Sequence, residues 1–279
     1  MLIAGLIGSS AAAAINTTPA LGPGGDLIKR DNLDPLPLCA TYADKKWQPA
    51  LDFDRDSCYN VAAISASGVT NRGLSVTAVA GVTSGCRDRQ DLDRQNVYSR
   101  TRCNSGWCAH MYAYYFEKDQ TSQVGGGHRH DWEHVVVWTR NDRIEYVAVS
   151  AHGGYDIRAA RDVQMEGNHP KVVYHKDDSN GMTHALRFAN AGEAPENHYG
   201  RWWYGSPISY YGFPNHDFRN AMLNKGWERA SVDIRDARFM PALESARPGA
   251  ASAFKAGQDG PEDIHNSPGI PEGGCGVRS

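Results

Sequence analysis

Residues 125–138 read GGGHRHDWEHVVVW, in which three glycines precede a run of ionisable and aromatic residues and then an apolar segment. The run VVVW at 135–138 that ends this stretch, and the earlier MYAYYF at 111–116, are apolar on both faces. Strands with one face in water usually alternate apolar and polar residues, whereas strands covered on both faces do not. We therefore expect both segments to be strands packed inside a sandwich.

Other short runs between turn residues extend this pattern to a mainly β domain. The sequence predicts strands at 73–81, 107–119, 133–139, 144–154 and 169–175. Asn141 and Asp142 predict a hairpin turn between the third and fourth of these strands. Helices are expected at 215–225, which has an Asn-rich start and spaced apolar residues, and at 159–165.

The two ends of the chain differ in composition from this domain. The first residues, 1–14, are apolar and end in small residues, which is typical of a secretory signal peptide, although a basic start is lacking. Residues 15–38 are predicted to be a pro-segment or a linker, because the dibasic pair Lys29 and Arg30 fits either one. The tail 247–279 is rich in Gly and Pro and is expected to be poorly structured.

Composition and charge exclude some partners. The 279 residues are 41% hydrophobic and 22% charged, which is enough to bury one substantial core. The formal net charge is −3 and no long Lys/Arg run occurs, so we expect no nucleic-acid partner. No later segment has the roughly 18 uninterrupted apolar residues that a transmembrane helix needs. The sequence thus indicates a secreted, extracellular protein.

The cysteines agree with secretion. An even number of them in a chain that enters an oxidising compartment predicts disulfides, with fifteen connectivities open for six cysteines. Metal binding by the thiols is the alternative, but the sequence has no CxxC pair. The six are Cys39, Cys58, Cys86, Cys103, Cys108 and Cys275.

Acidic residues gather at the start of the strand that contains VVVW. Side chains alternate along a strand, so Asp131 and Glu133 should share one face. Trp132 and His134 should then lie on the other face. The glycines allow a sharp turn just before His128, which would bring its imidazole toward the two carboxylates.

A neighbouring antiparallel strand would add carboxylates, because Glu117 and Asp119 stand at the polar end of 107–119. Like charges packed this closely repel one another unless they are protonated or bridged by a cation. Oxygen-rich ligation with one histidine favours Mg²⁺, Ca²⁺ or Mn²⁺ over Zn²⁺. The alternative is a hydrogen-bonded surface network that holds no ion.

Catalytic motifs are not found in this sequence. HRHDWEH superficially resembles a zinc hydrolase run, but HExxH is absent, and His128 and His130 have no i, i+4 relation. A GxSxG elbow, a P-loop and a GxGxxG are absent as well. We therefore do not expect an enzyme, and a metal-dependent hydrolase remains a remote alternative.

The motif GHRHDWE at 127–133 resembles the heptapeptide signature of the necrosis and ethylene-inducing peptide 1-like proteins (NLPs, with an NPP1 domain). These are secreted cytolysins and effectors of plant-associated fungi, oomycetes and bacteria. WCAHMYAYYFEKDQ at 107–120, SAHGGY at 150–155 and THALRF at 183–188 resemble further family segments. The resemblance covers roughly residues 50–245, in the family's order.

This resemblance implies an antiparallel β-sandwich with flanking helices, similar to actinoporins and fungal lectins, over a necrosis-inducing domain at 39–246. It implies a divalent cation, commonly calcium or magnesium, held by four residues. These are Asp119, His128, Asp131 and Glu133. The ion would lie beside a pocket for the terminal sugar of plant membrane glycosylinositol phosphorylceramide. His152 and His184 match positions near that pocket, while His130 and Trp132 belong to the signature, His130 with a structural role.

The resemblance also implies disulfide pairs. Cys58 with Cys86 corresponds to the family's disulfide, and Cys103 with Cys108 resembles the second disulfide of one subgroup. Cys39 and Cys275 then remain as a third pair by subtraction.

The chain departs from the family pattern before the HAL segment, where cytotoxic members often carry an exposed, membrane-entering Trp. This chain has DDSNGMTHAL there, and Met182 is the only apolar candidate for a loop tip. Two functions therefore stand. One is a cytolysin that acts at the plant plasma membrane. The other is a non-toxic relative that a plant immune receptor recognises through 107–129, or that serves growth or attachment. The aromatic run 201–213 fits a sugar- or membrane-facing surface and core packing equally.

Overall fold

The two longest strands among the described residues, β3 (Trp107–Gln120) and β4 (Gly127–Arg140), pair antiparallel along almost their whole length. They are seen in a computed structural model that describes residues 33–76, 81–122, 126–177, 183–258 and 275. All of these belong to one unit, residues 31–279. The predicted signal peptide at 1–14 lies outside the described residues, as does most of the predicted pro-segment or linker.

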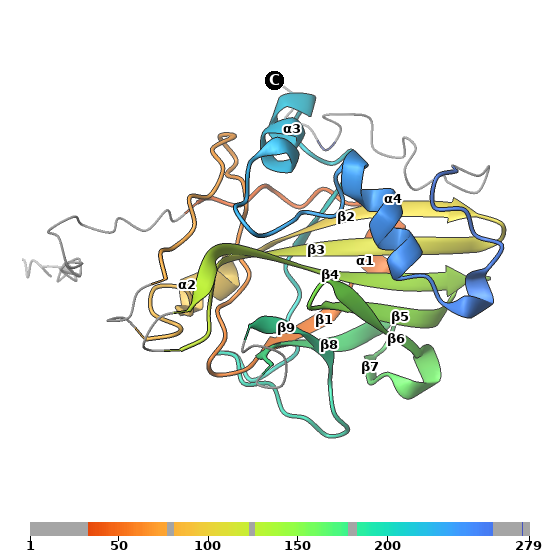
Figure 1. Ribbon diagram of the computed structural model, residues 1–279, viewed down its shortest axis with the longest axis horizontal. Coiled ribbons are helices and arrows are strands. Elements are labelled where there is room, and N and C mark those ends of the chain that lie inside the picture. Colours follow the sequence, from red (N-terminus) through yellow and green to blue (C-terminus); the bar gives the residue numbers. More distant parts are fainter. Residues whose placement is uncertain (1–32, 77–80, 123–125, 178–182, 259–274, 276–279) are drawn as a thin grey trace, which may run out of the picture. The chain divides into compact units, whose positions relative to one another are not determined.

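A six-stranded sheet is built around this pair. Its order is β10-β2-β3-β4-β5-β6, in which neighbours are antiparallel except for the parallel β10–β2 pair (Figure 1). The other strands are β2 (Asn96–Asn104), β5 (Arg143–Ala151), β6 (Gly154–Ala159) and β10 (Ser206–Ser209). Asn141 and Asp142 form the predicted turn between β4 and β5, both with positive φ (50° and 56°).

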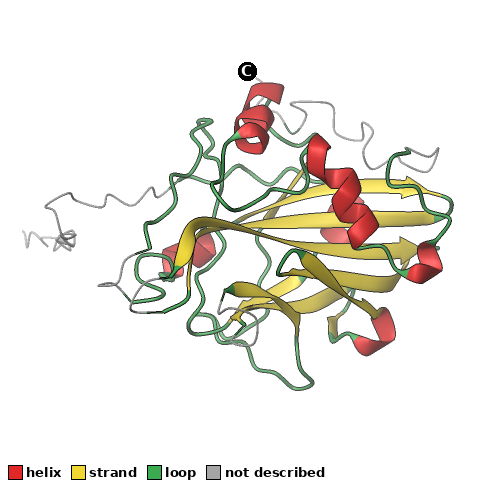
Figure 2. Ribbon diagram, viewed as in Figure 1, coloured by secondary structure: helices red, strands yellow, loops and turns green. Residues whose placement is uncertain are grey.

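A smaller sheet has β8 (His169–Lys176) at its centre. β8 pairs in parallel with β1 (Ala50–Phe53) and antiparallel with β7 (Met165–Glu166) and β9 (His184–Phe188). Strands dominate the fold, as Figure 2 shows. The prediction of a mainly β sandwich with antiparallel pairing is confirmed, with β1–β8 and β10–β2 as parallel exceptions.

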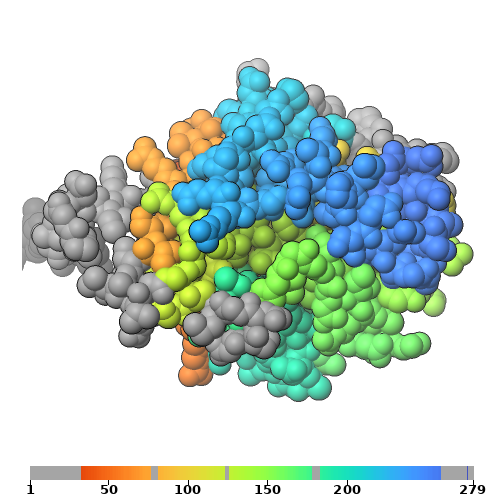
Figure 3. Space-filling view, viewed as in Figure 1, coloured from red at the N-terminus to blue at the C-terminus, as the bar shows by residue number. Residues whose placement is uncertain are grey.

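The larger sheet is covered on both faces, which explains its apolar strands. On one face, β-strand residues such as Val135 and Tyr114 pack with Tyr174 and Leu186 of the smaller sheet. On the other face, residues such as Trp138 pack with the helical layer. Figure 3 shows the blue C-terminal segment covering much of that side. The expectation that MYAYYF and VVVW lie inside a sandwich is therefore confirmed.

Helices are short and lie outside the sheets. They are α1 (Tyr42–Lys46), α2 (Arg89–Asp93), α3 (His216–Asn224) and α4 (Asp236–Ser245), with 3₁₀ turns η1 (Ala160–Asp162) and η2 (Gly249–Ala251). The helix predicted at 215–225 is confirmed as α3, and the Asn215 side chain caps it by accepting from the Phe218 amide at 2.9 Å. None of the helices among the described residues is long and apolar enough to span a bilayer.

Two predicted elements differ from the structure. The helix expected at 159–165 is only the single turn η1, because Val163 is already extended and β7 starts at Met165. The strand expected at 73–81 is absent from its described residues, 73–76 and 81, and the Leu74 amide bonds instead to the Glu117 carbonyl at 2.8 Å. Residues 77–80 lie outside the described residues. The predicted strand 144–154 runs too far. β5 ends at Ala151, and a turn follows in which His152 has φ +49°.

The tail from Arg247 was expected to be poorly structured, and this is wrong for residues 247–258. η2 lies there, and the buried Phe254 ring contacts the Trp138 ring edge-to-face at 4.9 Å. Asn104 donates to the carbonyls of Lys255 and Gln258 at 2.9 and 2.8 Å. Gly and Pro permit turns, and here the turns hold apolar residues against the helical face of the larger sheet.

The three expected disulfides are confirmed. Cys39 bonds to Cys275, Cys58 to Cys86, and Cys103 to Cys108, with Cα–Cα distances of 5.6, 5.0 and 4.0 Å. Cys103 and Cys108 face each other across β2 and β3.

The aromatic run 201–213 belongs mainly to the core. Trp202, Tyr210 and Phe213 are buried, and Tyr204, at 37%, is the large apolar residue of the run that is exposed. The packing interpretation is therefore favoured over a sugar- or membrane-facing surface.

Replacing Phe254 by alanine is expected to lower the free energy of unfolding by about 3–5 kcal/mol, because the change leaves a cavity beside Trp138. Chemical denaturation measures this loss. Met240→Ala is the control, since that side chain is 49% exposed, and it should change stability by no more than about 0.5 kcal/mol. Equal effects of the two changes would contradict the packing of the tail.

Candidate functional site

The start of β4 turns back very close to the end of β3. Gly126 and Gly127 have φ of +118° and +104°, a region that favours glycine. A Cβ on Gly127 would lie 1.8 Å from the Asp119 carbonyl oxygen. The predicted sharp turn is thus present at these two glycines, and it sets Asp119 opposite His128 in the ladder.

His130 sits at a kink in β4, with φ +61°. Its Nδ1 is hydrogen-bonded to the Tyr115 hydroxyl at 2.7 Å, and its ring lies edge-on to Trp227 at 5.0 Å. Burial lowers the pKa of His130 to about 4, so the ring is neutral near pH 7. These contacts fit the structural role that the sequence predicted for this residue.

Beyond the kink the strand alternates as expected. Trp132 packs in the core that faces the helices, and His134 accepts from the Asp233 amide on the same side at 2.9 Å. Asp131 faces the smaller sheet instead, where the Tyr174 hydroxyl donates to its Oδ2 at 2.8 Å. Glu133 accepts a hydrogen bond from the Ser150 hydroxyl of β5.

Asp119 of the larger sheet is hydrogen-bonded to His184 of the smaller sheet. It is 1% exposed, and His184 Nδ1 of β9 lies 2.6 Å from its Oδ1. The His184 amide also donates to both carboxylate oxygens, at 3.2 and 3.1 Å. His128 approaches from the other side, with Nε2 3.7 Å from Asp119 Oδ2. The structure therefore brings Asp119, His128 and His184 together.

The carboxylates influence one another. Burial, and then the charge of Asp119, raise the pKa of Asp131 to about 6. Burial and the Asp131 charge hold the pKa of Glu133 well above its usual value. Burial opposes a charged imidazole at His184, yet the hydrogen bond and charge of Asp119 raise its pKa. The site is thus a cluster of buried acids whose charged forms are disfavoured by burial and by one another.

His152 lies at the rim rather than in this cluster. It occupies the turn between β5 and β6, where its Nε2 is 2.8 Å from Asp177 Oδ2. Its Nδ1 is 3.2 Å from the Thr183 hydroxyl, next in sequence to His184. The loop in which the sequence lacks a Trp, with Met182, lies outside the described residues.

The residues expected to hold a divalent cation fit that ion in the chemistry of their side chains. Three buried carboxylates and one imidazole are oxygen-rich donors of the kind that calcium and magnesium take, and their partners are histidine, tyrosine, serine and backbone groups. In the described part of the chain, however, no three His, Cys, Asp or Glu side chains stand in the positions of a metal site. Ion binding would therefore need the carboxylates to draw closer together.

Sequence reasoning missed the residues that orient these acids. Tyr174 and Ser150 come from β8 and β5, and their sequence context shows only ordinary strand residues. The Asp56 carbonyl, 3.2 Å from His184 Nε2, was also missed. Glu117, considered as a further carboxylate, faces the other way and accepts from Asn71 at 3.1 Å.

Two packed sheets with flanking helices place this chain in the β-sandwich class. The family model described as necrosis inducing protein (NPP1) matches residues 41–246. The chain therefore belongs to the NPP1, or NLP, family.

Individual relatives agree with this assignment. NLP effector protein Pc107869 of Phytophthora capsici is 30% identical over 232 residues, 79% of this chain and 63% of the relative, so this chain spans only part of that protein. The structure of NLPPya in complex with glucosamine is 26% identical, with a TM-score of 0.65 over 79% of this chain and 99% of that one. The crystal structure of the non-toxic HaNLP3 protein is 28% identical, with a TM-score of 0.65 over 78% and 99%.

Gly127→Ala is expected to destabilise the protein more than Gly153→Ala. Both changes place alanine at positive φ, which costs about 1–3 kcal/mol, but the added Cβ meets the Asp119 carbonyl at Gly127 and nothing within 4 Å at Gly153. Chemical unfolding of the two variants gives the difference. Equal losses would show that β3 and β4 do not approach this closely.

Proposed function

We propose that this protein is a secreted, cation-dependent cytolysin that binds sugar headgroups of plant membrane sphingolipids and disrupts the membrane without covalent chemistry. The observation that carries this proposal is the burial of Asp119, Asp131 and Glu133 at one end of β3 and β4. Buried carboxylates are costly unless their charge is compensated. A divalent ion would compensate it.

Neutral donors hold two of the acids in place. The hydroxyls of Tyr174 and Ser150 fix Asp131 and Glu133 without cancelling their charge. Together with Asp119 and His128, these acids would hold calcium or magnesium. When bound, such an ion supplies a positive centre that oxygen atoms of a sugar can coordinate.

Sugar recognition is assigned to the surface beside this cluster. His184 contacts Asp119 directly, and His152 reaches the same place through Thr183. The glucosamine complex of NLPPya supports a sugar ligand, and glycosylinositol phosphorylceramide is the headgroup that we propose here. Three disulfides support secretion, because such bonds persist in oxidising compartments.

Leakage from eudicot plasma-membrane vesicles tests this function. The purified protein is expected to release a trapped dye with calcium but not with chelator, and Asp131→Asn is expected to lower the rate at least about tenfold, as loss of a metal ligand or its orienting shell commonly does. Asp156→Asn is the matched control, since Asp156 lies on β6 and pairs with Arg158. Its leakage should equal that of the wild type.

Leakage that persists with chelator, or in the Asp131→Asn variant, would contradict ion-dependent lysis. No leakage from a folded protein that binds calcium would favour the second function.

The second candidate function is a non-toxic relative recognised as an immune pattern. The loop that lacks Trp favours it, as does the likeness to the non-toxic HaNLP3 protein. β3 is buried, so a receptor could read the part of this segment at Trp107–Gln120 only after the chain unfolds or is cleaved.

Under this second function, a synthetic peptide of residues 107–129 and the reduced, unfolded protein are both expected to trigger ethylene release in leaf tissue. A peptide of the same composition in scrambled order is the control. Responses to the native protein alone would count against recognition of this segment.

A further inference from the structure

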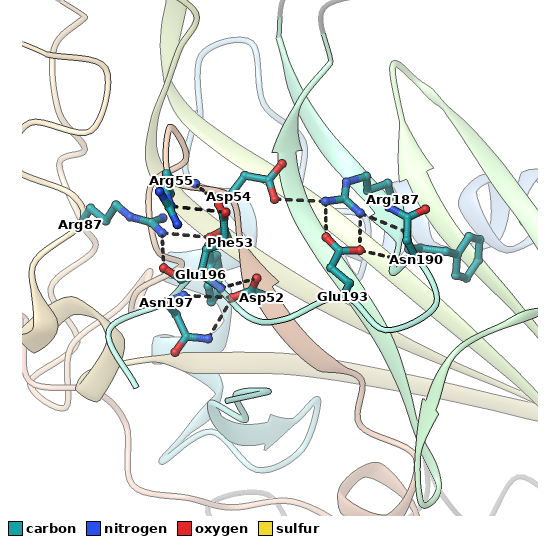
Figure 4. Close-up of polar contacts among 11 residues, drawn as sticks. Asp52, Phe53, Asp54, Arg55, Arg87, Arg187, Asn190, Glu193, Glu196 and Asn197 are labelled. Carbon is teal, nitrogen blue, oxygen red and sulfur yellow. Dashed lines mark hydrogen bonds and ion pairs between the residues drawn. The ribbon is translucent and has the colours of Figure 1, made fainter. Parts of the chain in front are cut away.

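Arg87 is an unusual arginine, because its guanidinium binds backbone rather than an acid. It donates to the carbonyls of Ser57, Phe53 and Glu196 at 2.6, 2.9 and 3.1 Å. Figure 4 shows the side chain reaching the end of β1 and the segment around Glu196. Burial lowers the pKa of Arg87, but the pKa of an arginine starts so high that the side chain stays charged near pH 7.

The first two carbonyls enclose a tight turn, residues 53–57. Within it the Ser57 amide bonds to the Asp54 carbonyl at 2.9 Å. The turn also joins β8, because the Asp54 amide donates to the Tyr174 carbonyl at 3.1 Å. Arg87 thus holds the turn through two carbonyls, and β8 holds it through the Asp54 amide.

This turn also contacts the histidine of the candidate site. The carbonyl oxygen of Asp56 lies 3.2 Å from His184 Nε2, and the other ring nitrogen of His184 lies 2.6 Å from Asp119. A ring that is fixed at both nitrogens has one orientation. The position of the Asp56 carbonyl therefore sets how His184 meets Asp119.

The disulfide brings Arg87 to this turn. Cys86 precedes Arg87 and is bonded to Cys58, which follows Ser57. The Tyr59 amide adds a bond to the Cys86 carbonyl at 2.8 Å, and the Arg87 guanidinium lies 4.7 Å over the Tyr59 ring.

We propose that Arg87 is a positioning residue for the cation site: it fixes the turn 53–57, whose Asp56 carbonyl orients His184 against Asp119. The calcium measurement rests on the proposed function, whereas the orientation of His184 tests the role of Arg87 without it. His184 is the direct partner of the proposed ligand Asp119, and loss of such a partner commonly changes metal affinity by about 10- to 100-fold. Arg87 acts on Asp119 through His184, so we expect an effect at the lower end of that range.

The experiment compares Arg87→Ala and Arg87→Lys with Arg100→Ala. Arg100 is the control, because it also donates to a backbone carbonyl, that of Ile234, at 2.8 Å and lies over the Tyr210 ring at 4.1 Å, although unlike Arg87 it also pairs with Asp236 at 2.8 Å. Calcium affinity is measured by calorimetry, and the side-chain N–H signal of His184 is measured by NMR with the metal-free protein. Thermal unfolding shows which variants are folded at the temperature used.

Arg87→Ala is expected to weaken calcium binding about tenfold and to remove the protected His184 N–H signal, while Arg100→Ala changes neither. Combined with His184→Ala, it should add no further loss, because Arg87 acts through that ring. If Arg87→Ala does not fold, Arg87→Lys, which cannot reach all three carbonyls in the same fork, carries the same expectation.

An unchanged His184 signal in a folded Arg87 variant would overturn the proposal, and so would losses that multiply in the double variant. If the wild-type protein binds no calcium, the proposed function fails, whereas the NMR comparison still decides the role of Arg87.

Discussion

Burial of the β3–β4 pair on both faces is the constraint on which the rest of the structure depends. The smaller sheet covers one face and the helices with the C-terminal segment cover the other. Near the end where β3 leads into β4, polar side chains are therefore buried as well. Asp119, Asp131 and Glu133 lie there at 8% exposure or less, and each needs a partner.

Those partners link the two sheets. His184 of β9 and Tyr174 of β8 reach across to Asp119 and Asp131, so the candidate site also holds the sandwich together at this end. The partners satisfy hydrogen bonds but leave the acids buried and close together, so burial, and then the charge of Asp119, raise the pKa of Asp131. The buried carboxylates of this site repel one another, and a bound cation would remove that repulsion. Arg87, which donates to the Phe53 carbonyl at the end of β1, is proposed to act on this site through the turn 53–57.

Much of this fold follows from local sequence. Apolar segments without a polar face revealed the buried strands, and alternation placed Asp131 and Trp132 on opposite faces. β2 was missed because NVYSRTRCN carries polar residues toward partners that only the folded chain supplies. The tail was misjudged for a similar reason: Phe254 is the one large apolar residue of RPGAASAFKAGQ at 247–258, and only its contact with the Trp138 ring shows where it belongs.

The site was predictable as a set of residues but not as a geometry. The motif around His128 supplied most of the acids and histidines, whereas the kink at His130 and the partners Tyr174, Ser150 and Asp56 depend on contacts between distant segments. Such contacts leave no local pattern in the sequence.

The cation site is tested most directly by a crystal structure of the protein grown in calcium, with anomalous scattering data that identify the ion. If the buried acids bind calcium, one strong peak lies between Asp119, Asp131 and Glu133, with oxygen distances of about 2.3–2.6 Å. His128 should complete the set. Saturating calcium with no peak at this position, or a peak at another place in the fold, would contradict the claim that these buried acids form a cation site.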